Sequence, residues 1–243
     1  MSSPDSPGEV SATPVAILAG GLATRLGALS KVTPKALVAV AGRPFIDHQL
    51  ALLRRDGVRN VVICAGHLGE MIRAYLGDGA GFGLAVHYSF DGERLLGTGG
   101  ALRRALPLLG GTFFVLYGDS YRDIRLSPVL AALVASGKPA LMTVFANEGR
   151  WDTSNVLFDG SSVLRYDKRN PTPNMRYIDY GLGVLTAPLL TAYKADQAFD
   201  LADVYAKCSV DGQLAGYEAE RRFYEIGTPA GLAEADTFLR ERT

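Results

Sequence analysis

Apolar runs alternate with amphipathic stretches along the first 145 residues of the chain. The first run, Val15–Leu18, ends at Gly20-Gly21, a pattern typical of a buried strand in a parallel sheet. Similar runs predict further strands at Asn60–Cys64, Leu84–Tyr88, Thr112–Tyr117 and Ala140–Phe145. Between them, apolar positions at helical spacing predict helices that open at Pro44 and cover Leu68–Leu76, Gly97–Leu106 and Pro128–Ala135.

The pattern changes after about residue 146. Shorter strands joined by turns are predicted at Asn155–Phe158, Val163–Tyr166 and Tyr177–Leu185, and we expect them to complete a mixed sheet and to cover a substrate. The last forty residues predict a helix, a strand and a helix, at Leu201–Lys207, Arg222–Ile226 and Pro229–Arg240. This alternation indicates an α/β fold, with three layers around a Rossmann-like mixed sheet.

Length and composition suit a single globular domain. The chain has 243 residues, of which 48% are hydrophobic and 21% charged. Residues 1–13, rich in Ser, Pro and Asp, predict a disordered tail before one domain over residues 14–243. The tail lacks the basic start and apolar run of a signal peptide, and no stretch approaches the roughly 20 apolar residues of a membrane span. We therefore expect a cytoplasmic protein without a membrane partner.

Charge and cysteine content narrow the class of ligand. Twenty-five basic residues balance twenty-five acidic ones, so the chain has no overall basic field to hold a nucleic acid. An anionic ligand must therefore be met by a local site. Cys64 and Cys208 lie far apart in the sequence and are expected to be reduced, buried thiols.

The loop after the first strand has the residues that a triphosphate needs. Gly20 and Gly21 allow backbone N–H groups to approach phosphates closely, while Arg25 and Lys35 supply positive charge for a pyrophosphate leaving group. Open α/β sheets bind ligands at this end of a strand. The alternative is a strand-to-helix turn with a solvated arginine and lysine. No Gly-x4-Gly-Lys-Ser/Thr motif occurs, which excludes a P-loop NTPase.

The run Leu18–Leu26, with Pro34-Lys35 and Val40–Phe45, resembles the sugar-1-phosphate nucleotidyltransferases over residues 14–240. The resemblance implies the nucleotide-diphospho-sugar transferase fold and is greatest to the short heptose-1-phosphate guanylyltransferase and N-acetylmuramate-1-phosphate uridylyltransferase branches. It implies that Arg25 and Lys35 act in catalysis. It further implies nucleotide contacts from the first loop, at Leu18, Ala19, Gly20, Gly21 and Thr24.

The segment Leu96–Ala101 is similar to the family's second glycine-rich element, which contacts the base. The resemblance implies base contacts from Gly97 and Thr98, whereas the plain alternative is a helix N-terminus with a threonine near its cap. His67 follows another predicted strand and either borders the same pocket or caps a helix at the surface.

A metal site is predicted where Gly118-Asp119 follows the fourth apolar strand. Mg²⁺ prefers oxygen ligands, and the resemblance implies that Asp119 binds it, with Gly118 beside the nucleotide. A turn aspartate is the alternative. The family's second metal carboxylate belongs to an Asp-Ile-Gly-x-Pro motif, which here reads Glu225-Ile226-Gly227-Thr228-Pro229. We expect Glu225 to be the second ligand of Mg²⁺.

The sugar phosphate is predicted to lie against the later strands. Lys168 resembles the family lysine that holds this phosphate, and Asp179, Tyr180 and Gly181 lie on a strand that resembles its sugar-binding strand. Trp151 or Tyr180 is suited to stack on a sugar ring. Each of these is otherwise an ordinary strand or surface residue.

The predicted reaction is Mg²⁺-dependent transfer of a nucleoside monophosphate from an NTP to a sugar 1-phosphate, with release of pyrophosphate. The first substrate hypothesis is GTP with D-glycero-D-manno-heptose 1-phosphate, and the second is UTP with a hexose-type 1-phosphate. A non-catalytic subunit that binds nucleotide sugars and a cytidylyltransferase for a phosphoalcohol are further alternatives. We expect a monomer or homodimer that needs no general base, because the sugar phosphate is already a nucleophile.

Overall fold

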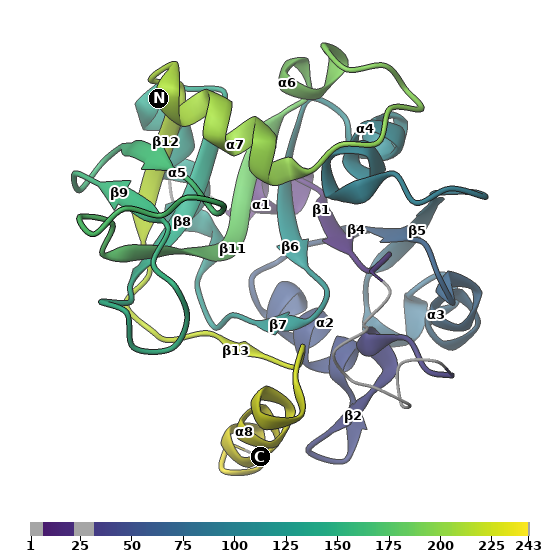
Figure 1. Ribbon diagram of the computed structural model, residues 1–243. Coiled ribbons are helices and arrows are strands. Elements are labelled where there is room, and N and C mark those ends of the chain that lie inside the picture. Colours follow the sequence, from purple (N-terminus) through teal and green to yellow (C-terminus); the bar gives the residue numbers. More distant parts are fainter. Residues whose placement is uncertain (1–6, 22–31, 243) are drawn as a thin grey trace.

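The computed structural model describes residues 7–21 and 32–242, which fold around one large mixed sheet (Figure 1). Four parallel strands form its first half: β1 (Val15–Leu18), β4 (Asn60–Ala65), β5 (Ala85–Phe90) and β6 (Thr112–Tyr117). Their order across the sheet is β6-β1-β4-β5. Each of them matches a predicted apolar run to within two residues at either end.

The second half of the sheet is antiparallel to the first where the two meet. β11 (Tyr177–Thr186) pairs with β6 and β8 (Ala140–Ala146), and β8 pairs in parallel with β12 (Leu214–Glu218). The short strands β9 (Val156–Phe158) and β10 (Val163–Tyr166) extend the sheet beyond the start of β11. The predicted mixed sheet is thereby confirmed.

Residues along each parallel strand alternate between two hydrophobic cores because successive side chains point to opposite faces. Val15 and Ile17 enter one core, whereas Ala16 enters the other. The first core packs against α2 (Phe45–Arg55), α3 (Gly69–Leu76) and α5 (Leu126–Ser136). The second packs against α4 (Gly97–Leu109), α6 (Pro188–Thr191) and α7 (Leu201–Val210). Helices on both faces give the three layers that the sequence predicts.

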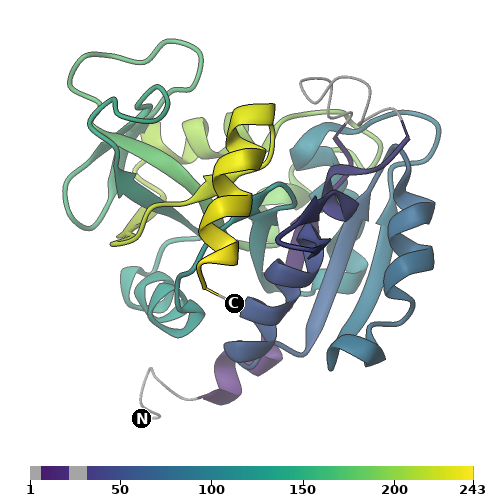
Figure 2. The ribbon, with the colours of Figure 1, turned by 90° about the horizontal axis from the view of Figure 1, so that it is seen from below.

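A smaller group of short strands and one helix lies beside the main sheet, at the bottom of Figure 1. β7 (Ser120–Tyr121) pairs with β13 (Tyr224–Glu225), and β2 (Ala39–Val40) pairs with β3 (Arg43–Pro44). The C-terminal helix α8 (Pro229–Arg240) packs on these strands around the buried Ile226. Figure 2, seen from the side of α8, shows this helix in front of the body of the molecule. The described chain also contains two short 3-10 helices, η2 (Lys35–Leu37) and η3 (Ala80–Phe82).

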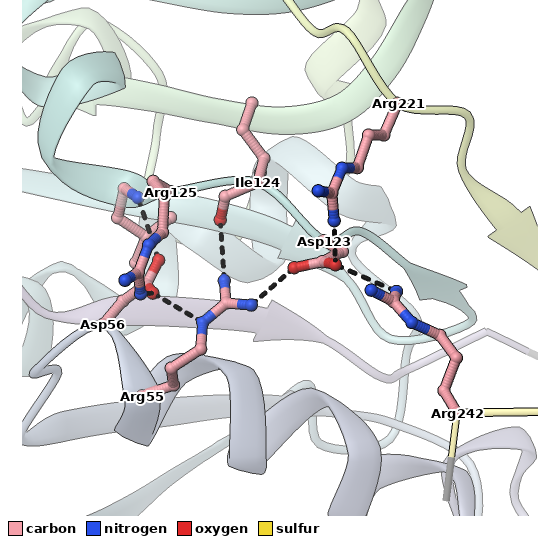
Figure 3. Close-up of polar contacts among 8 residues, drawn as sticks. Arg55, Asp56, Asp123, Ile124, Arg125, Arg221 and Arg242 are labelled. Carbon is pink, nitrogen blue, oxygen red and sulfur yellow. Dashed lines mark hydrogen bonds and ion pairs between the residues drawn. The ribbon is translucent and has the colours of Figure 1, made fainter.

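Asp123 fixes the position of this C-terminal segment (Figure 3). Its carboxylate accepts hydrogen bonds from Arg55 at the end of α2, from Arg221 before β13 and from Arg242 after α8. Asp56 pairs with Arg55 as well. Burial would raise the pKa of Asp123, but hydrogen bonds and charge from Arg55 and Arg242 lower it below its usual range. Three segments that are distant in sequence thus meet at one ionised carboxylate.

Two sequence expectations need correction. The tail predicted for residues 1–13 contains a helix, α1 (Pro7–Ala12), because Val10 supplies an apolar anchor that is only 2% exposed in the first core. The strand β12 was not predicted, because its five residues include Gly216 and end in a glutamate. None of the helices within the described ranges is long and apolar enough to cross a membrane.

Candidate active site

A cavity of about 290 Å³ opens at the carboxyl ends of the parallel strands. The ends of β1, β4, β5 and β6 and the start of α4 all contribute to its wall. This is the edge at which open α/β sheets bind their ligands. The structure brings most of the predicted nucleotide and metal residues to this wall: Leu18, Ala19, Gly20, Gly21, Lys35, Gly97, Thr98, Gly118 and Asp119.

Four of the predicted nucleotide and metal residues are not among the described residues that line this cavity, and Glu225 is one of them. Thr24 and Arg25 lie outside the described residues. His67 is exposed at the start of the turn before α3 and is absent from the described lining of the cavity. Its position fits the surface alternative better than a nucleotide contact.

Two of the predicted glycines are needed for packing between neighbouring loops. A Cβ atom on Gly20 would lie 3.1 Å from the backbone nitrogen of Gly66, after β4. A Cβ atom on Gly118 would lie 2.8 Å from the carbonyl oxygen of Leu18. Because these glycines have no side chain, the backbones at the ends of β1, β4 and β6 can approach one another closely. Both glycines line the cavity.

Lys35 and Asp119 form an ion pair at one end of the cavity, with 2.8 Å between Nζ and Oδ2. Lys35 begins the 3-10 helix η2, and Asp119 follows β6. Burial would raise the pKa of Asp119, but the charge and hydrogen bond of Lys35 outweigh it and lower the pKa. Both side chains stay partly exposed, at 22% and 31%, so an incoming ligand can reach them.

Glu225 lies beside Asp119 because β13 pairs with β7. The Oγ atom of Ser120 lies 3.3 Å from Asp119 Oδ1 and 3.2 Å from Glu225 Oε1, so both carboxylates meet one hydroxyl. The backbone N–H of Ile226 also donates to the carbonyl of Asp119. The two carboxylates predicted to bind metal are therefore neighbours, although they lie in opposite halves of the sequence.

Arg122 was not recognised from the sequence and is the buried cation of this region. Its side chain is 2% exposed, and Nη2 lies 3.6 Å from Glu225 Oε1. Nε donates to the carbonyl of Tyr180, and the guanidinium lies over the rings of Tyr180 and Phe223. The only sequence signal was a charged residue three positions after the metal-type aspartate.

The second glycine-rich element is packed mainly against the protein itself. The N–H groups of Gly99 and Gly100 donate to the carbonyl of Phe199, and Cβ atoms on these glycines would collide with residues 197–200. The hydroxyl of Thr98 donates to Asp200 and accepts from Leu201. Thr98 therefore lines the cavity as predicted, but its hydroxyl is engaged in joining α4 to α7.

Asp91 lines the cavity and is a second residue that the sequence did not reveal. It follows β5, as Asp119 follows β6, and it is 7% exposed. Burial raises the pKa of its carboxyl, whereas the N–H of Leu96 and the charge of Arg104 lower it. Beside it, burial and the charge of Asp91 raise the pKa of Cys64 to about 12, which keeps this thiol neutral.

The predicted sugar side divides between exposed and buried residues. Lys168 is exposed. Burial raises the pKa of the nearby Asp179, against the hydrogen bond from Gly181 and the charges of Arg122 and Lys168. The prediction that the Tyr180 side chain contacts the sugar is wrong, because this side chain is fully buried in the first core.

Gly181 and Trp151 are the remaining residues that the sequence predicts on the sugar side of the site. Gly181 has a φ of +80° in an irregular part of β11, and Arg122 packs where its Cβ would lie. Trp151 is 44% exposed and borders a second cavity of about 560 Å³, together with Glu225 and the start of α8. Arg222 covers its ring at 4.9 Å from the centroid. Trp151 thus remains available to a ligand, whereas Tyr180 does not.

Comparison with known proteins identifies the family. Residues 15–154 match the nucleotidyl transferase family. The chain belongs to this family. The N-acetylmuramate α-1-phosphate uridylyltransferase of Neisseria meningitidis is 42% identical to this nucleotidyltransferase over 225 residues, which are 90% of this chain and 95% of that protein. The enzyme of the same name from Caulobacter vibrioides is 30% identical over 236 residues, 93% and 96% of the two chains.

Further relatives place the nucleotidyltransferase among enzymes of sugar phosphates. The D-glycero-α-D-manno-heptose 1-phosphate guanylyltransferase of Campylobacter jejuni is 35% identical over 214 residues, 88% of this chain and 94% of that protein. The fold matches that of HddC from Yersinia pseudotuberculosis complexed with GMP-PN, with a TM-score of 0.76 at 21% identity over 93% of this chain and 99% of that chain. The chain is a sugar-1-phosphate nucleotidyltransferase.

Proposed function

We propose that this nucleotidyltransferase transfers a uridylyl group from UTP to N-acetylmuramate α-1-phosphate and releases pyrophosphate. The geometric observation that carries the proposal is the Lys35–Asp119 pair at the end of a cavity built from strand ends, with Glu225 beside it. The choice of substrates rests on two relatives with this name that match nearly the whole chain, one of them at 42% identity.

GTP with D-glycero-D-manno-heptose 1-phosphate is the second candidate pair. It is favoured by the 35% identity to the Campylobacter jejuni enzyme, in a match that covers 94% of that protein. The two candidates differ in both base and sugar, but they need the same phosphate chemistry. The arrangement of Lys35, Asp119 and Glu225 therefore serves either reaction.

In the proposed reaction, an oxygen of the sugar phosphate forms a bond to the α-phosphorus of the NTP. The bond between this phosphorus and the bridging oxygen breaks, and the pyrophosphate leaves with the electron pair. Lys35 offsets the negative charge of the phosphates, and Lys168 is proposed to hold the sugar phosphate. Arg25, Thr24 and the glycines of the first loop are proposed to bind the triphosphate, as the sequence predicts.

Mg²⁺ fits the carboxylate pair beside Lys35. Asp119, Glu225 and the bridging hydroxyl of Ser120 offer hard oxygen donors, the type that Mg²⁺ prefers. Phosphate oxygens and water complete such sites, because Mg²⁺ is rarely held by protein ligands alone. When bound, the ion would neutralise charge on the phosphates. Lys35 pairs with Asp119 and Arg122 with Glu225, so a cation offsets the charge of each carboxylate.

The substrate pair is tested by mixing the purified protein and Mg²⁺ with each of four NTPs and a panel of sugar 1-phosphates. Pyrophosphate release is the readout. We expect release with UTP and N-acetylmuramate 1-phosphate at least tenfold faster than with any other pair. Faster release with GTP and the heptose 1-phosphate would replace this proposal by the second candidate. Release from neither pair would contradict both.

A further inference from the structure

Gln49 is a buried amide beside the turn that carries Asp119. It lies within α2 and is only 1% exposed. Its Nε2 donates to the carbonyl of Tyr117 and to the carbonyl of Ser120, at 2.9 Å in each case. These two carbonyls lie on either side of Gly118 and Asp119, so one side-chain amide closes the turn between β6 and β7.

Backbone hydrogen bonds hold the same turn from two other directions. The N–H of Gly118 donates to the carbonyl of Leu18 at 3.0 Å, which ties the turn to β1. The carbonyl of Asp119 accepts from the N–H of Ile226 at 2.9 Å, which ties it to the segment after β13. Gln49 adds the attachment to α2. Because the carboxylate of Asp119 projects from this turn, its position depends on all three attachments.

A small cavity lies between Gln49 and Arg122. Both side chains line it, together with Ser120 and the apolar Leu116 and Leu182, and its volume is about 20 Å³. Oε1 of Gln49 and Nη1 of Arg122 are both buried, and neither has a hydrogen-bond partner among the described residues. A buried water needs about 10–15 Å³ and at least two polar partners. The cavity is therefore large enough for one water, and its lining offers that water an acceptor and a donor.

We propose that Gln49 is a positioning residue for the two carboxylates that are proposed to bind Mg²⁺. Its Nε2 holds the turn of Asp119, while one buried water accepts from Arg122 Nη1 and donates to Gln49 Oε1. Arg122 in turn holds Glu225, with 3.6 Å between Nη2 and Oε1. The network thus ties both carboxylates to α2. The inference rests on the proposed function for its effect on turnover, but its geometry is testable without substrate.

Amide hydrogen exchange tests the role of Gln49 without any substrate. Gln49→Met keeps a similar volume but has no N–H group to donate. We expect exchange at Gly118 and at Ile226 to become at least tenfold faster relative to exchange at Ile63, which lies within the central strand β4. Gln49→Asn keeps the amide but shortens its reach by one methylene, so it should give a smaller change at the same two sites.

Leu109→Ala is the matched control for a general loss of stability. Leu109 is 1% exposed and lies at the end of α4 away from Gly97 and the active-site cavity. Removing its side chain leaves a void in the core and destabilises the fold. Exchange at Gly118, Ile226 and Ile63 should therefore accelerate together in this variant. Thermal unfolding checks that each variant is folded.

Turnover with the preferred substrate pair is the second measurement. At saturating substrates and Mg²⁺, kcat of Gln49→Met should fall at least tenfold, because a displacement of about 1 Å at a reaction centre costs about a hundredfold in rate. Leu109→Ala should stay within twofold of wild type at a temperature where it is folded. Exchange at Gly118 and Ile226 that follows Ile63 in both Gln49 variants, or a wild-type kcat in Gln49→Met, would overturn the inference. A wild-type protein without pyrophosphate release would fault the proposed reaction, while the exchange result would still decide the role of Gln49.

A crystal structure of the wild-type protein tests the water bridge. We expect one water within about 3.2 Å of both Gln49 Oε1 and Arg122 Nη1. In Gln49→Met this water should be lost or displaced, because the thioether is a weak acceptor. A wild-type cavity without a water, or direct contact between the two side chains, would overturn the bridge.

Discussion

Arg122 and Glu225 are bound as a pair in which the cation is buried and the carboxylate is half exposed, with 3.6 Å between Nη2 and Oε1. The family motif has an aspartate where this chain has Glu225, so the side chain is longer by one methylene. Arg122 and Ser120 both contact the same oxygen of Glu225 and hold the longer side chain beside Asp119. The substitution is thus accompanied by a contact that restrains it.

Replacing Arg122 by methionine should destabilise the protein. The variant keeps a similar volume but leaves the carbonyl of Tyr180 without its guanidinium donor, and a buried unpaired polar group costs about 1–3 kcal/mol. Urea unfolding measures the loss of free energy of unfolding. The matched control is Arg125→Met, because Arg125 is exposed and its ion pair with Asp56 should contribute less than about 1 kcal/mol. Equal losses in the two variants would contradict a structural role for Arg122.

Lys35→Met should destabilise the protein more at neutral pH than at acidic pH. In the folded state the pKa of Asp119 is lowered, because Lys35 outweighs the effect of burial. A carboxyl with a lowered folded-state pKa stabilises the fold above its unfolded-state pKa, and the contribution is lost as pH falls through the folded-state pKa. Without Lys35, burial should raise the pKa of Asp119, so the variant lacks this stabilisation at neutral pH, and its difference in stability from wild type should shrink as pH falls.

Urea unfolding followed by circular dichroism, at a series of pH values from pH 7 to pH 2, measures this difference. We expect the stabilisation lost at neutral pH to be about 1 kcal/mol, because both side chains of the pair are partly exposed. Lys194→Met is the control, since Lys194 is exposed in the loop before α7. A loss of stability in Lys35→Met that is the same at every pH would refute the assigned cause of the shift.

Asp119→Asn should reduce pyrophosphate release at least a hundredfold while the protein stays folded. The amide keeps the shape of the side chain and its neighbour Ser120, but it loses the charge that attracts both Lys35 and a metal ion. Turnover with the preferred substrate pair is the measurement, and thermal unfolding is the check on folding. Activity within threefold of wild type would exclude Asp119 from the reaction centre.

Asp123→Asn should loosen the C-terminal segment that carries Glu225. The variant lacks the charge that three arginines share, and hydrogen bonds to charged groups contribute about 1.5–3 kcal/mol. Amide hydrogen exchange at Ile226, whose N–H donates to Asp119, should become faster. Exchange in β1 and β4 should change less than exchange at Ile226. Uniform acceleration throughout the chain would point to global destabilisation instead of local release.

Gly99→Ala should destabilise the joint between α4 and α7. The new methyl group would collide with the ring of Phe199, and forcing extra volume into a packed contact costs about 1–3 kcal/mol. Gly111→Ala is a matched control, because nothing lies within 4 Å of its Cβ position. Urea unfolding should separate the two variants by at least about 1 kcal/mol. A Gly99→Ala variant as stable as Gly111→Ala would contradict the described packing.

The sequence predicts the fold well because its parallel strands are continuous apolar runs that end in glycine. Val15–Leu18 and Thr112–Tyr117 lie where predicted, and the loops after them carry Gly20 and Asp119 to one cavity. Such local patterns reveal which strand end a residue follows. They are less informative at β12, where Gly216 and a terminal glutamate weaken the apolar pattern.

Contacts between distant segments account for what the sequence did not reveal. The sequence predicts Thr98 as a base contact, but it does not reveal that the hydroxyl also donates to Asp200, more than a hundred residues later. The sequence does not reveal that Tyr180 is buried, because its burial depends on the irregularity of β11 and on the position of Arg122. Arg122 itself has the pattern of a surface arginine, because its burial depends on Phe223.

The pairing of Ser120 with Glu225 has a consequence for the synthesis of the enzyme. The four strand ends that form the cavity belong to the first half of the chain, whereas the second carboxylate belongs to its last twenty residues. Because translation proceeds from the N-terminus, a growing chain carries the sequence of those strand ends well before it can supply Glu225. Arg242, which anchors this segment to Asp123, follows still later in the sequence. The carboxylate pair can therefore assemble only after β13 has been synthesised.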